Sequence, residues 1–266
     1  MFTALFSKNP EKAWVEKCFL AYTPVWMALM AVMMFTGWAG SWGNTALLAH
    51  SLVVALPVLL IPAVLARRHP SGRPWHQRYW FKANVYLAIF SFIGNYFGSA
   101  YFFDVLGMVY GFGNASTHLE ASLVGSSHQR VPLIMYFYTQ AYFMTYHVTA
   151  NITLRQLRRI PLPWPKLFFA LCVFAVGYAW AWAETKAMAN PLMADLFYYE
   201  KMELMLRYGS GIYALYFLTS FPIYCRMDEN AQEKPWSLAQ AAAGALSAGM
   251  LTLFLLDLAA KWVGQL

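Results

Sequence analysis

The sequence has little charge and little cysteine. Asp, Glu, Lys and Arg make up 12% of the 266 residues, whereas hydrophobic residues make up 60%. Soluble domains carry about a quarter of charged residues, so this composition excludes an ordinary water-soluble protein. The three cysteines, Cys18, Cys172 and Cys225, have no paired spacing, which argues against disulfides and against a thiolate metal site. We interpret them as small buried hydrophobic residues.

The motifs of several enzyme classes are also missing from the sequence. It has no HExxH, no closely spaced His boxes and no CxxC, so zinc hydrolases and di-iron hydroxylases have no ligand set. It has no glycine-rich nucleotide loop and no GxSxG, which argues against a nucleotide-dependent enzyme and a serine hydrolase. We therefore expect no metal and no cofactor, and chemistry that is limited to proton transfer.

Long apolar runs predict an all-α, polytopic membrane bundle that forms a single transmembrane domain over residues 1–266. Each run is long enough to cross a bilayer as a helix, and charged residues fall between the runs. We find no internal repeat and no separate soluble domain. The seven predicted spans are 18–38, 45–66, 83–103, 132–153, 167–187, 208–225 and 237–260.

The distribution of basic residues predicts the orientation of these spans. If the amino terminus is cytoplasmic, 14 of the 19 Lys and Arg residues fall in inner segments, which matches the positive-inside rule. The outer segments then hold Arg130, Lys186, Lys201, Arg207 and Lys261. The net charge of +7 thus belongs to short loops beside the membrane, which argues against a nucleic-acid partner.

A polar stripe crosses the third predicted span, within the segment Arg78–Gly107. Asn84, Ser91 and Asn95 recur at spacings of seven and four residues, which places them on one helix face. An unpartnered amide in hydrocarbon costs several kcal/mol, so this face must point to other helices or to a cavity. Plain hydrogen bonding between helices is one interpretation, and a ligand site flanked by Tyr96 is the other.

The remaining local signals concern helix shape and loops. Pro57, Pro62 and Pro222 lie inside predicted spans, and the loss of a backbone donor at each predicts local kinks. The segment Gly111–Arg130 is typical of an outer loop, because it is rich in Gly, Ser, Asn and His. The segment Ala194–Arg207 mixes aromatic and charged residues and predicts a short amphipathic helix at the outer interface.

Several blocks of sequence resemble one enzyme family. The stretch RYWFKAN followed by FSFIGNYFGSAYFFDVLG is similar to the signature region of the cycloeucalenol cycloisomerases, which isomerise cyclopropyl sterols. The resemblance extends in order from near residue 9 to near residue 229, and fits poorly over 111–130, 1–8 and 234–266. The other similar blocks are NPEKAW (Asn9–Trp14), FLAYTPVW (Phe19–Trp26), HVTANITLRQLR (His147–Arg158), AETKAMAN (Ala183–Asn190) and YALYFLTSFPIYCRMDE (Tyr213–Glu229).

The resemblance implies a reaction, a partner and a location. In this family the substrate is a sterol with a cyclopropane bridge between carbons 9 and 19. A proton reaches carbon 19, the ring opens, and loss of a proton from carbon 8 leaves an 8,9 double bond, as in the conversion of cycloeucalenol to obtusifoliol. Such a reaction needs no redox cofactor. The implied partners are a sterol and membrane lipid, and the implied location is a bacterial inner membrane or the endoplasmic reticulum.

Glu184 is the first candidate for the acid that protonates carbon 19. It lies in the family-like block AETKAMAN, and Trp180 and Trp182 precede it in the outer half of the fifth span. Desolvation in such surroundings favours the neutral, proton-donating form of a carboxyl group. The alternative is an interfacial Glu that forms an ion pair with Lys186 or Lys201.

His147 is the second candidate, in the family-like block HVTANITLR, although a lone His on a helix is commonly structural. Asn151 follows at i+4, where its amide would fix the imidazole tautomer. The predicted spans place His147 near the inner side and Glu184 near the outer side, roughly 15 Å apart along the membrane normal. The two groups are therefore not expected to form one acid and base pair.

Seven further residues are predicted to contact the substrate, and two residues to form ion pairs. Asp228 and Glu229, beside Arg226, predict a cap or ion-pair network at the inner side. A non-catalytic sterol-binding or transport protein with the same fold remains the alternative function. The absence of an inverted repeat favours the enzyme. The predicted substrate-binding residues are Asn84, Ser91, Asn95, Tyr96, Asn151, Trp180 and Glu200.

Overall fold

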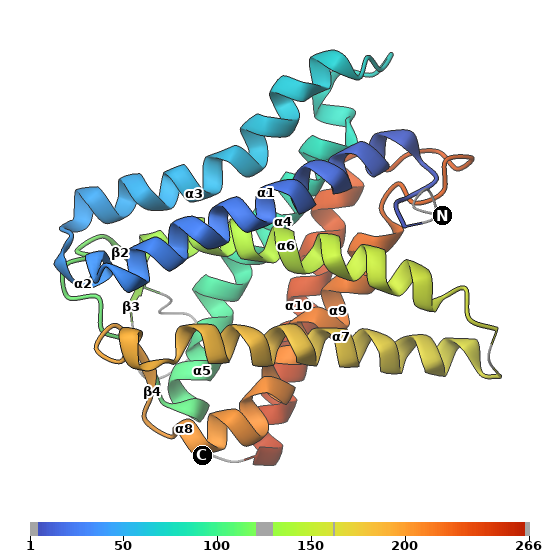
Figure 1. Ribbon diagram of the computed structural model, residues 1–266. Coiled ribbons are helices and arrows are strands. Elements are labelled where there is room, and N and C mark those ends of the chain that lie inside the picture. The colour runs from blue at the N-terminus through green and yellow to red at the C-terminus, as the bar shows by residue number, and fades with distance from the viewer. Residues whose placement is uncertain (1–4, 121–129, 162, 264–266) are drawn as a thin grey trace.

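The structure is a computed structural model that describes residues 5–120, 130–161 and 163–263. Part of the predicted loop Gly111–Arg130 therefore lies outside the described residues. Helices dominate the fold, and the described residues form seven long helical segments in two sets that cross each other (Figure 1). These segments are α1 (Pro10–Phe35), α3 (Asn44–Leu65), α4 (Tyr79–Ile93) continued by η4 (Gly94–Gly98) and α5 (Ser99–Leu106), α6 (Leu133–Leu157), α7 (Pro165–Met188), α9 (Ser210–Arg226) and α10 (Leu238–Val263).

Short elements connect the long helices. Among them, the π-helical turn η6 leads directly into α9. They are α2 (Trp38–Ser41), η2 (Ala66–Arg68), η3 (Trp75–Gln77), β1 (Met108–Tyr110), β2 (His118–Glu120), β3 (Arg130–Pro132), η5 (Pro191–Met193), β4 (Phe197–Tyr199), α8 (Met202–Leu204) and η6 (Met205–Gly209).

The predicted all-α membrane bundle is confirmed, and five helices in the described residues are long and apolar enough to span a bilayer. Their bounds are Pro10–Phe35, Asn44–Arg68, Tyr79–Leu106, Pro165–Met188 and Leu238–Val263. α6 and α9 agree in position with two further predicted spans but are more polar. The count of seven spans therefore stays a prediction.

α6 is more polar because it lies at the centre of the bundle. It packs against α1, α3, α4, α7 and α9, so most of its surface meets protein and not lipid. A helix surrounded in this way can carry polar groups that hydrogen-bond to its neighbours. Thr139, Thr145, His147 and Asn151 of α6 are all buried. Polar side chains of α6 are thus kept inside the bundle, away from its outer surface.

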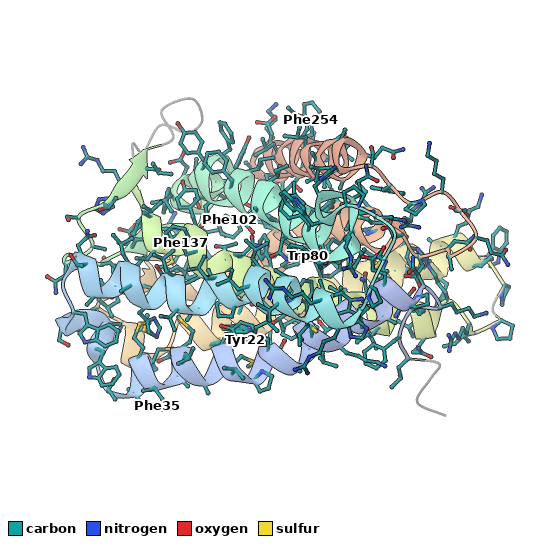
Figure 2. The ribbon with its side chains drawn as sticks, turned by 90° about the horizontal axis from the view of Figure 1, so that it is seen from above. Tyr22, Phe35, Trp80, Phe102, Phe137 and Phe254 are labelled. Carbon is teal, nitrogen blue, oxygen red and sulfur yellow. The ribbon has the colours of Figure 1, made fainter. Side chains whose placement is uncertain are left out.

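The outer surface is apolar, as lipid contact requires. Figure 2 shows Phe35 and Phe254 projecting from the helices, and they are 76% and 60% exposed. Exposed large hydrophobic side chains also follow α3, α7 and α10. An exposed apolar surface of this extent would be unstable in water but is matched to a hydrocarbon environment.

Ion pairs join the helix ends on the side where α1 begins. Lys12 and Glu16 of α1 are 0% and 1% exposed, and Lys12 Nζ lies 2.9 Å from a carboxylate oxygen of Glu229. Arg155 of α6 contacts both acids, at 2.5 Å from Glu229 and 2.6 Å from Glu16. Burial opposes ionisation of Glu229, but the bonds from Arg155 and the charge of Lys12 outweigh it and hold its pKa below the ordinary value.

A second group of pairs holds α4 at the same end. Lys82 is fully buried and pairs with Asp228, and it also donates to the carbonyl oxygen of Trp236 at 2.8 Å. Arg78, at the start of α4, donates to Glu11 of α1 at 2.8 Å. The predicted network around Asp228 and Glu229 is thus confirmed. Together the two groups of ion pairs, here called the inner network, fix the ends of α1, α4, α6 and α9.

The opposite end of the molecule contains two small antiparallel sheets. Met108 of β1 faces Tyr199 of β4, and His118 of β2 faces Pro132 of β3. The prediction of one amphipathic helix over Ala194–Arg207 is wrong for its first part, because residues 197–199 form β4. Gly111 permits this pairing, since a Cβ there would lie 2.3 Å from the carbonyl oxygen of Asp195. A contact between two distant backbone segments has no periodic signal in the sequence.

Reporter fusions at the two termini give a direct test of the predicted topology. With the inner network on the cytoplasmic side, a reporter fused after the last residue is expected on the outer side of the membrane. A reporter fused before the first residue is expected on the cytoplasmic side. Activity of a compartment-specific reporter at each end measures this. A cytoplasmic carboxy-terminal reporter would contradict the combination of an inside amino terminus with seven spans.

Candidate functional site

A cavity of about 660 Å³ lies in the half of the bundle opposite the inner network. This volume falls in the range of small-molecule sites, roughly 300–1,000 Å³. Side chains from α1, α5, α6, α7 and α9 form its walls, and residues of β1 and β4 close one end. Most of the wall is aromatic or aliphatic. The polar residues other than tyrosine that line the cavity are Asn95, Ser99, Thr139, Glu184 and Asn190.

Glu184 projects from the last part of α7 into this cavity. The hydroxyl of Tyr213 on α9 donates to its carboxyl group at 2.5 Å, and Tyr146 of α6 lines the same cavity. The carboxyl group is partly accessible, and the accessible part faces the cavity. Within the described residues no ion pair joins it to Lys186 or Lys201. Glu184 is therefore a carboxyl group that the phenol of Tyr213 positions beside an apolar space.

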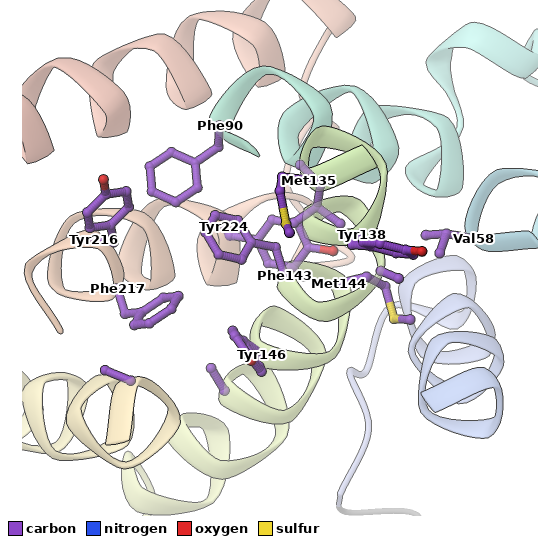
Figure 3. Close-up of a cluster of buried hydrophobic side chains, with 14 of the residues drawn as sticks. Val58, Phe90, Met135, Tyr138, Phe143, Met144, Tyr146, Tyr216, Phe217 and Tyr224 are labelled. Atoms are coloured by element: carbon purple, nitrogen blue, oxygen red, sulfur yellow. The ribbon is translucent and has the colours of Figure 1, made fainter. Parts of the chain in front are cut away.

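Close packing of α7 on α9 brings Glu184 and Tyr213 together. A Cβ at Gly177 would lie 2.8 Å from the Cβ of Phe217, so only glycine allows this approach. Gly177 precedes Glu184 by seven residues, and Tyr213 precedes Phe217 by four, so both pairs lie on the same contacting faces. Figure 3 shows Phe217 beside Tyr216, with Phe143 and Tyr146 of α6 close by. Gly177 thus permits the close approach of α7 to α9 on which the contact between Glu184 and Tyr213 depends.

Asn95 forms the second polar group in the cavity wall. Its Nδ2 donates to Thr139 Oγ1 at 2.8 Å, and Thr139 Oγ1 also lies 2.8 Å from the hydroxyl of Tyr142. Asn95 is 6% exposed, and its Oδ1 accepts no hydrogen bond from the described residues. This oxygen therefore offers a hydrogen-bond acceptor to a hydroxyl group in the cavity.

A π-helical turn places Asn95 in the wall. The turn Gly94–Gly98 inserts a wider turn between α4 and α5, which shifts the facing residues relative to a regular helix. A Cβ at Gly98 would lie 1.9 Å from the hydroxyl oxygen of Tyr216, so glycine is required for the ring of Tyr216 to fit. The predicted stripe of Asn84, Ser91 and Asn95 is buried along its whole length, yet only Asn95 reaches the cavity.

His147 lies outside the cavity wall. It is fully buried, its Nδ1 lies 2.7 Å from the carbonyl oxygen of Phe143, and its Nε2 lies 2.6 Å from Ser220 Oγ. Aromatic rings, including Phe221 and Tyr224, surround the imidazole. Ser220 is seven residues from Tyr213 on α9, about 10 Å along the axis, so His147 and Glu184 do not share a partner.

The other predicted substrate-binding residues also lie away from the cavity wall. Asn84 donates to Val58 O at 3.1 Å and Trp80 O at 2.9 Å. Ser91 is buried, and the Tyr96 ring stacks on the ring of Phe92.

Asn151, Trp180 and Glu200 have three different surroundings. Asn151 donates to Glu16 at 3.2 Å and so adjoins the inner network. Trp180 stacks on the ring of Tyr146, with ring centroids 4.5 Å apart, and so packs against a residue of the cavity wall. Glu200 is exposed, and its backbone N–H donates to Gly107 O at 2.9 Å.

Sequence reasoning did not identify Thr139, Tyr142, Tyr213 and Tyr216 as cavity residues. Tyr213 and Tyr216 belong to the block YALYFLTS, which was quoted for its resemblance but contains no acid or base to draw notice. Thr139 and Tyr142 lie on α6 ahead of the block that begins at His147. The available signal in the sequence was that one family-like block contains Tyr213 and Tyr216 and another contains the acid Glu184.

Comparison with known proteins gives a match over nearly the whole chain. The sequence is 36% identical over 265 residues to a protein of Arabidopsis thaliana named cycloeucalenol cycloisomerase. The aligned region covers 97% of this chain and 89% of the plant protein. No family model and no solved structure matches the chain. The aligned region is long enough to include both the cavity and the inner network.

Proposed function

The chain belongs to the cycloeucalenol cycloisomerase family, and on this basis we propose that it opens the 9,19-cyclopropane ring of a membrane sterol. It is an isomerase of sterol biosynthesis. The product would carry an 8,9 double bond, as in the conversion of cycloeucalenol to obtusifoliol. The observation that carries this proposal is Glu184, a carboxyl group that Tyr213 holds against an apolar cavity.

In this mechanism Glu184 supplies the proton that opens the ring. The proton passes to carbon 19, the electron pair of the bond between carbons 9 and 19 forms the new C–H bond, and carbon 9 becomes cationic. Loss of the proton from carbon 8 then leaves its electron pair in the 8,9 double bond. A positioned acid in such a step contributes about 10²- to 10⁴-fold to the rate.

The same carboxylate is the proposed acceptor for the proton of carbon 8. Among the described residues that line the cavity, Glu184 is the only carboxyl group, and none is His, Lys or Arg. After it donates, Glu184 is a carboxylate beside the cation and is the strongest base at hand. Return of the proton restores the starting state of the enzyme, so the cycle needs no further reactant.

Aromatic rings are suited to the cation that forms between the two proton transfers. Phe102, Tyr110, Phe143 and Tyr216 line the cavity together with Tyr213. A ring face attracts a cation, and this attraction reaches about 2 kcal/mol in a site without water. Because carbon 9 is neutral before protonation, this stabilisation applies to the intermediate and to the transition states that flank it.

Asn95 is the proposed contact for the 3-hydroxyl group of the sterol. Asn95 lines the cavity, and Thr139 fixes its amide through Nδ2, which leaves Oδ1 as the acceptor for the hydroxyl. Binding of the hydroxyl at this point would hold the rigid ring system in one orientation. A fixed orientation is what brings the cyclopropane to the acid and keeps it there.

Turnover in heavy water tests the proposed chemistry. We expect purified protein in nanodiscs to convert a cyclopropyl sterol to its 8,9-unsaturated isomer, with deuterium in the new methyl group and a slower rate. Mass spectrometry and proton NMR of the product measure both. Tight sterol binding with no product would favour the alternative, a non-catalytic sterol-binding or transport protein. Product with an unlabelled methyl group would contradict a solvent-exchangeable acid.

A further inference from the structure

One wall of the cavity is formed by side chains that are also exposed on the outer surface of the bundle. Met27 and Phe35 of α1 line the cavity and are 49% and 76% exposed. On the other side, Leu192 of η5 lines the cavity and is 53% exposed. The same side chains thus meet the interior of the cavity and the apolar surroundings of the protein.

The packing of the helices explains why this wall is thin. α1 packs on α3 and α6, whereas α7 packs on α6 and α9. In Figure 1 α1 crosses α6 whereas α7 runs below α6, and in the described part of the chain α1 and α7 are not packed against each other along their lengths. α1 approaches the α7 side through η5 at the outer end. At the level of the cavity, the wall between α1 and α7 is therefore formed by side chains of these two helices and of η5.

The end of the cavity that faces the outer aqueous side is closed by backbone. Met108 and Tyr110 of β1 and Phe197 and Tyr199 of β4 line this end. The two strands are paired over three residues, and Gly111 N donates to Leu196 O at 2.9 Å to extend the pairing. Paired strands hold their side chains in place, so this end is a less suitable entrance than the α1 and α7 side.

The side chains between α1 and α7 are unusually flexible for a wall. Met27, Met30 and Met34 follow one another at spacings of three and four on one face of α1, and all line the cavity. Met188 lines it from α7. Methionine is unbranched and adapts its shape to what it contacts, so a row of methionines can part and close again. No charged residue among those described lies in this row.

We propose that these residues form a lateral opening, through which a flat, apolar polycyclic lipid passes directly between the membrane and the cavity. The lateral opening is the gap between α1, at Met27, Ala31 and Met34, and α7 with η5, at Ala187 and Leu192. Its apolar rim favours a ligand that stays in lipid, whose transfer through water would be costly. Only the identification of the lipid as a sterol rests on the proposed function.

Bulky substitutions at the rim test this opening. We expect Ala31→Trp and Ala187→Trp to slow both association and dissociation of a fluorescent conjugated-triene sterol by about tenfold, with little change in Kd, because a narrowed passage affects both directions equally. The matched controls are Val32→Trp and Ala179→Trp, on the same two helices. Both control positions are exposed and lie outside the cavity wall. Stopped-flow energy transfer from protein tryptophan, with the sterol delivered in phosphatidylcholine vesicles, measures the rates.

Each outcome separates the opening from the function. Rates that match the controls would contradict the lateral opening, and so would a rise in Kd at an unchanged association rate, since that result assigns Ala31 and Ala187 to the binding surface. Slower binding in Tyr198→Trp, on the outward face of β4, with normal binding in the rim variants would place the entrance at the aqueous end. Failure of the wild-type protein to bind the probe or turn over a cyclopropyl sterol would instead contradict the proposed function.

Discussion

Glu184→Gln is expected to lower the rate of ring opening by about a hundredfold or more while sterol binding survives. The amide keeps the shape of the side chain and its contact with Tyr213, but it has no proton to transfer. The loss should therefore fall on kcat, and KM should change little. Product formation from a cyclopropyl sterol in nanodiscs, together with an equilibrium binding measurement, checks both.

Two further variants make this result specific. Glu203→Gln is the matched control, because Glu203 is an exposed carboxyl group of α8 outside the cavity wall, and its turnover should stay normal. His147→Gln removes the other candidate acid and tests a buried residue, so its thermal stability must be measured beside its activity. Normal turnover of Glu184→Gln with a large loss in folded His147→Gln would transfer the role of the acid to His147.

Lys82→Met is expected to lower the stability of the protein by about 3–5 kcal/mol, because it removes one partner of a buried ion pair and leaves the Asp228 carboxyl group without its counter-ion. Both side chains of this pair are almost fully buried, at 0% and 1% exposure. Thermal unfolding in detergent should show a decrease in Tm on the order of 10 °C. Sterol binding at temperatures below the transition should be retained, since the pair lies far from the cavity.

A double variant and a surface pair serve as controls for this prediction. Adding Asp228→Asn to Lys82→Met should recover part of the loss, since Asn tolerates the positive φ of 50° at this position and still accepts from Trp236 N. Lys261→Met breaks an exposed pair with Asp257 and should leave Tm unchanged. Equal effects of Lys82→Met and Lys261→Met would show that burial does not govern the cost.

The amino-acid pattern predicted the parts of the fold that depend on composition and period. Long apolar runs located the helices, and the spacing of Asn84, Ser91 and Asn95 correctly excluded contact with lipid, because each of these properties is local to one helix. The ion pairs of Asp228 and Glu229 were also predictable, since charges at the end of an apolar span have few other partners.

The features that shape the cavity depend on contacts between distant residues and could not be predicted. In the described parts of the chain, the two π-helical turns fall at Gly94–Gly98 and Met205–Gly209, and not at the prolines where kinks were expected. In the first of them a Cβ at Gly98 would meet Tyr216 of α9, and in the second a Cβ at Gly209 would meet Met205 of the same turn. The contact of Glu184 with Tyr213 likewise depends on how closely α7 approaches α9. Periodicity within a single helix contains no information about either approach.

The position of the inner network determines where the helices can pivot. α1 is held within its first two turns by Lys12 and Glu16, whereas Phe35 lies 19 residues beyond Glu16, about 28 Å along the axis. When the charged end of α1 stays fixed, a tilt of about 4° moves the far end of this helix by about 2 Å. Because the charged end of α1 is held in place, a small tilt of α1 about that end changes the width of the lateral opening that faces the lipid.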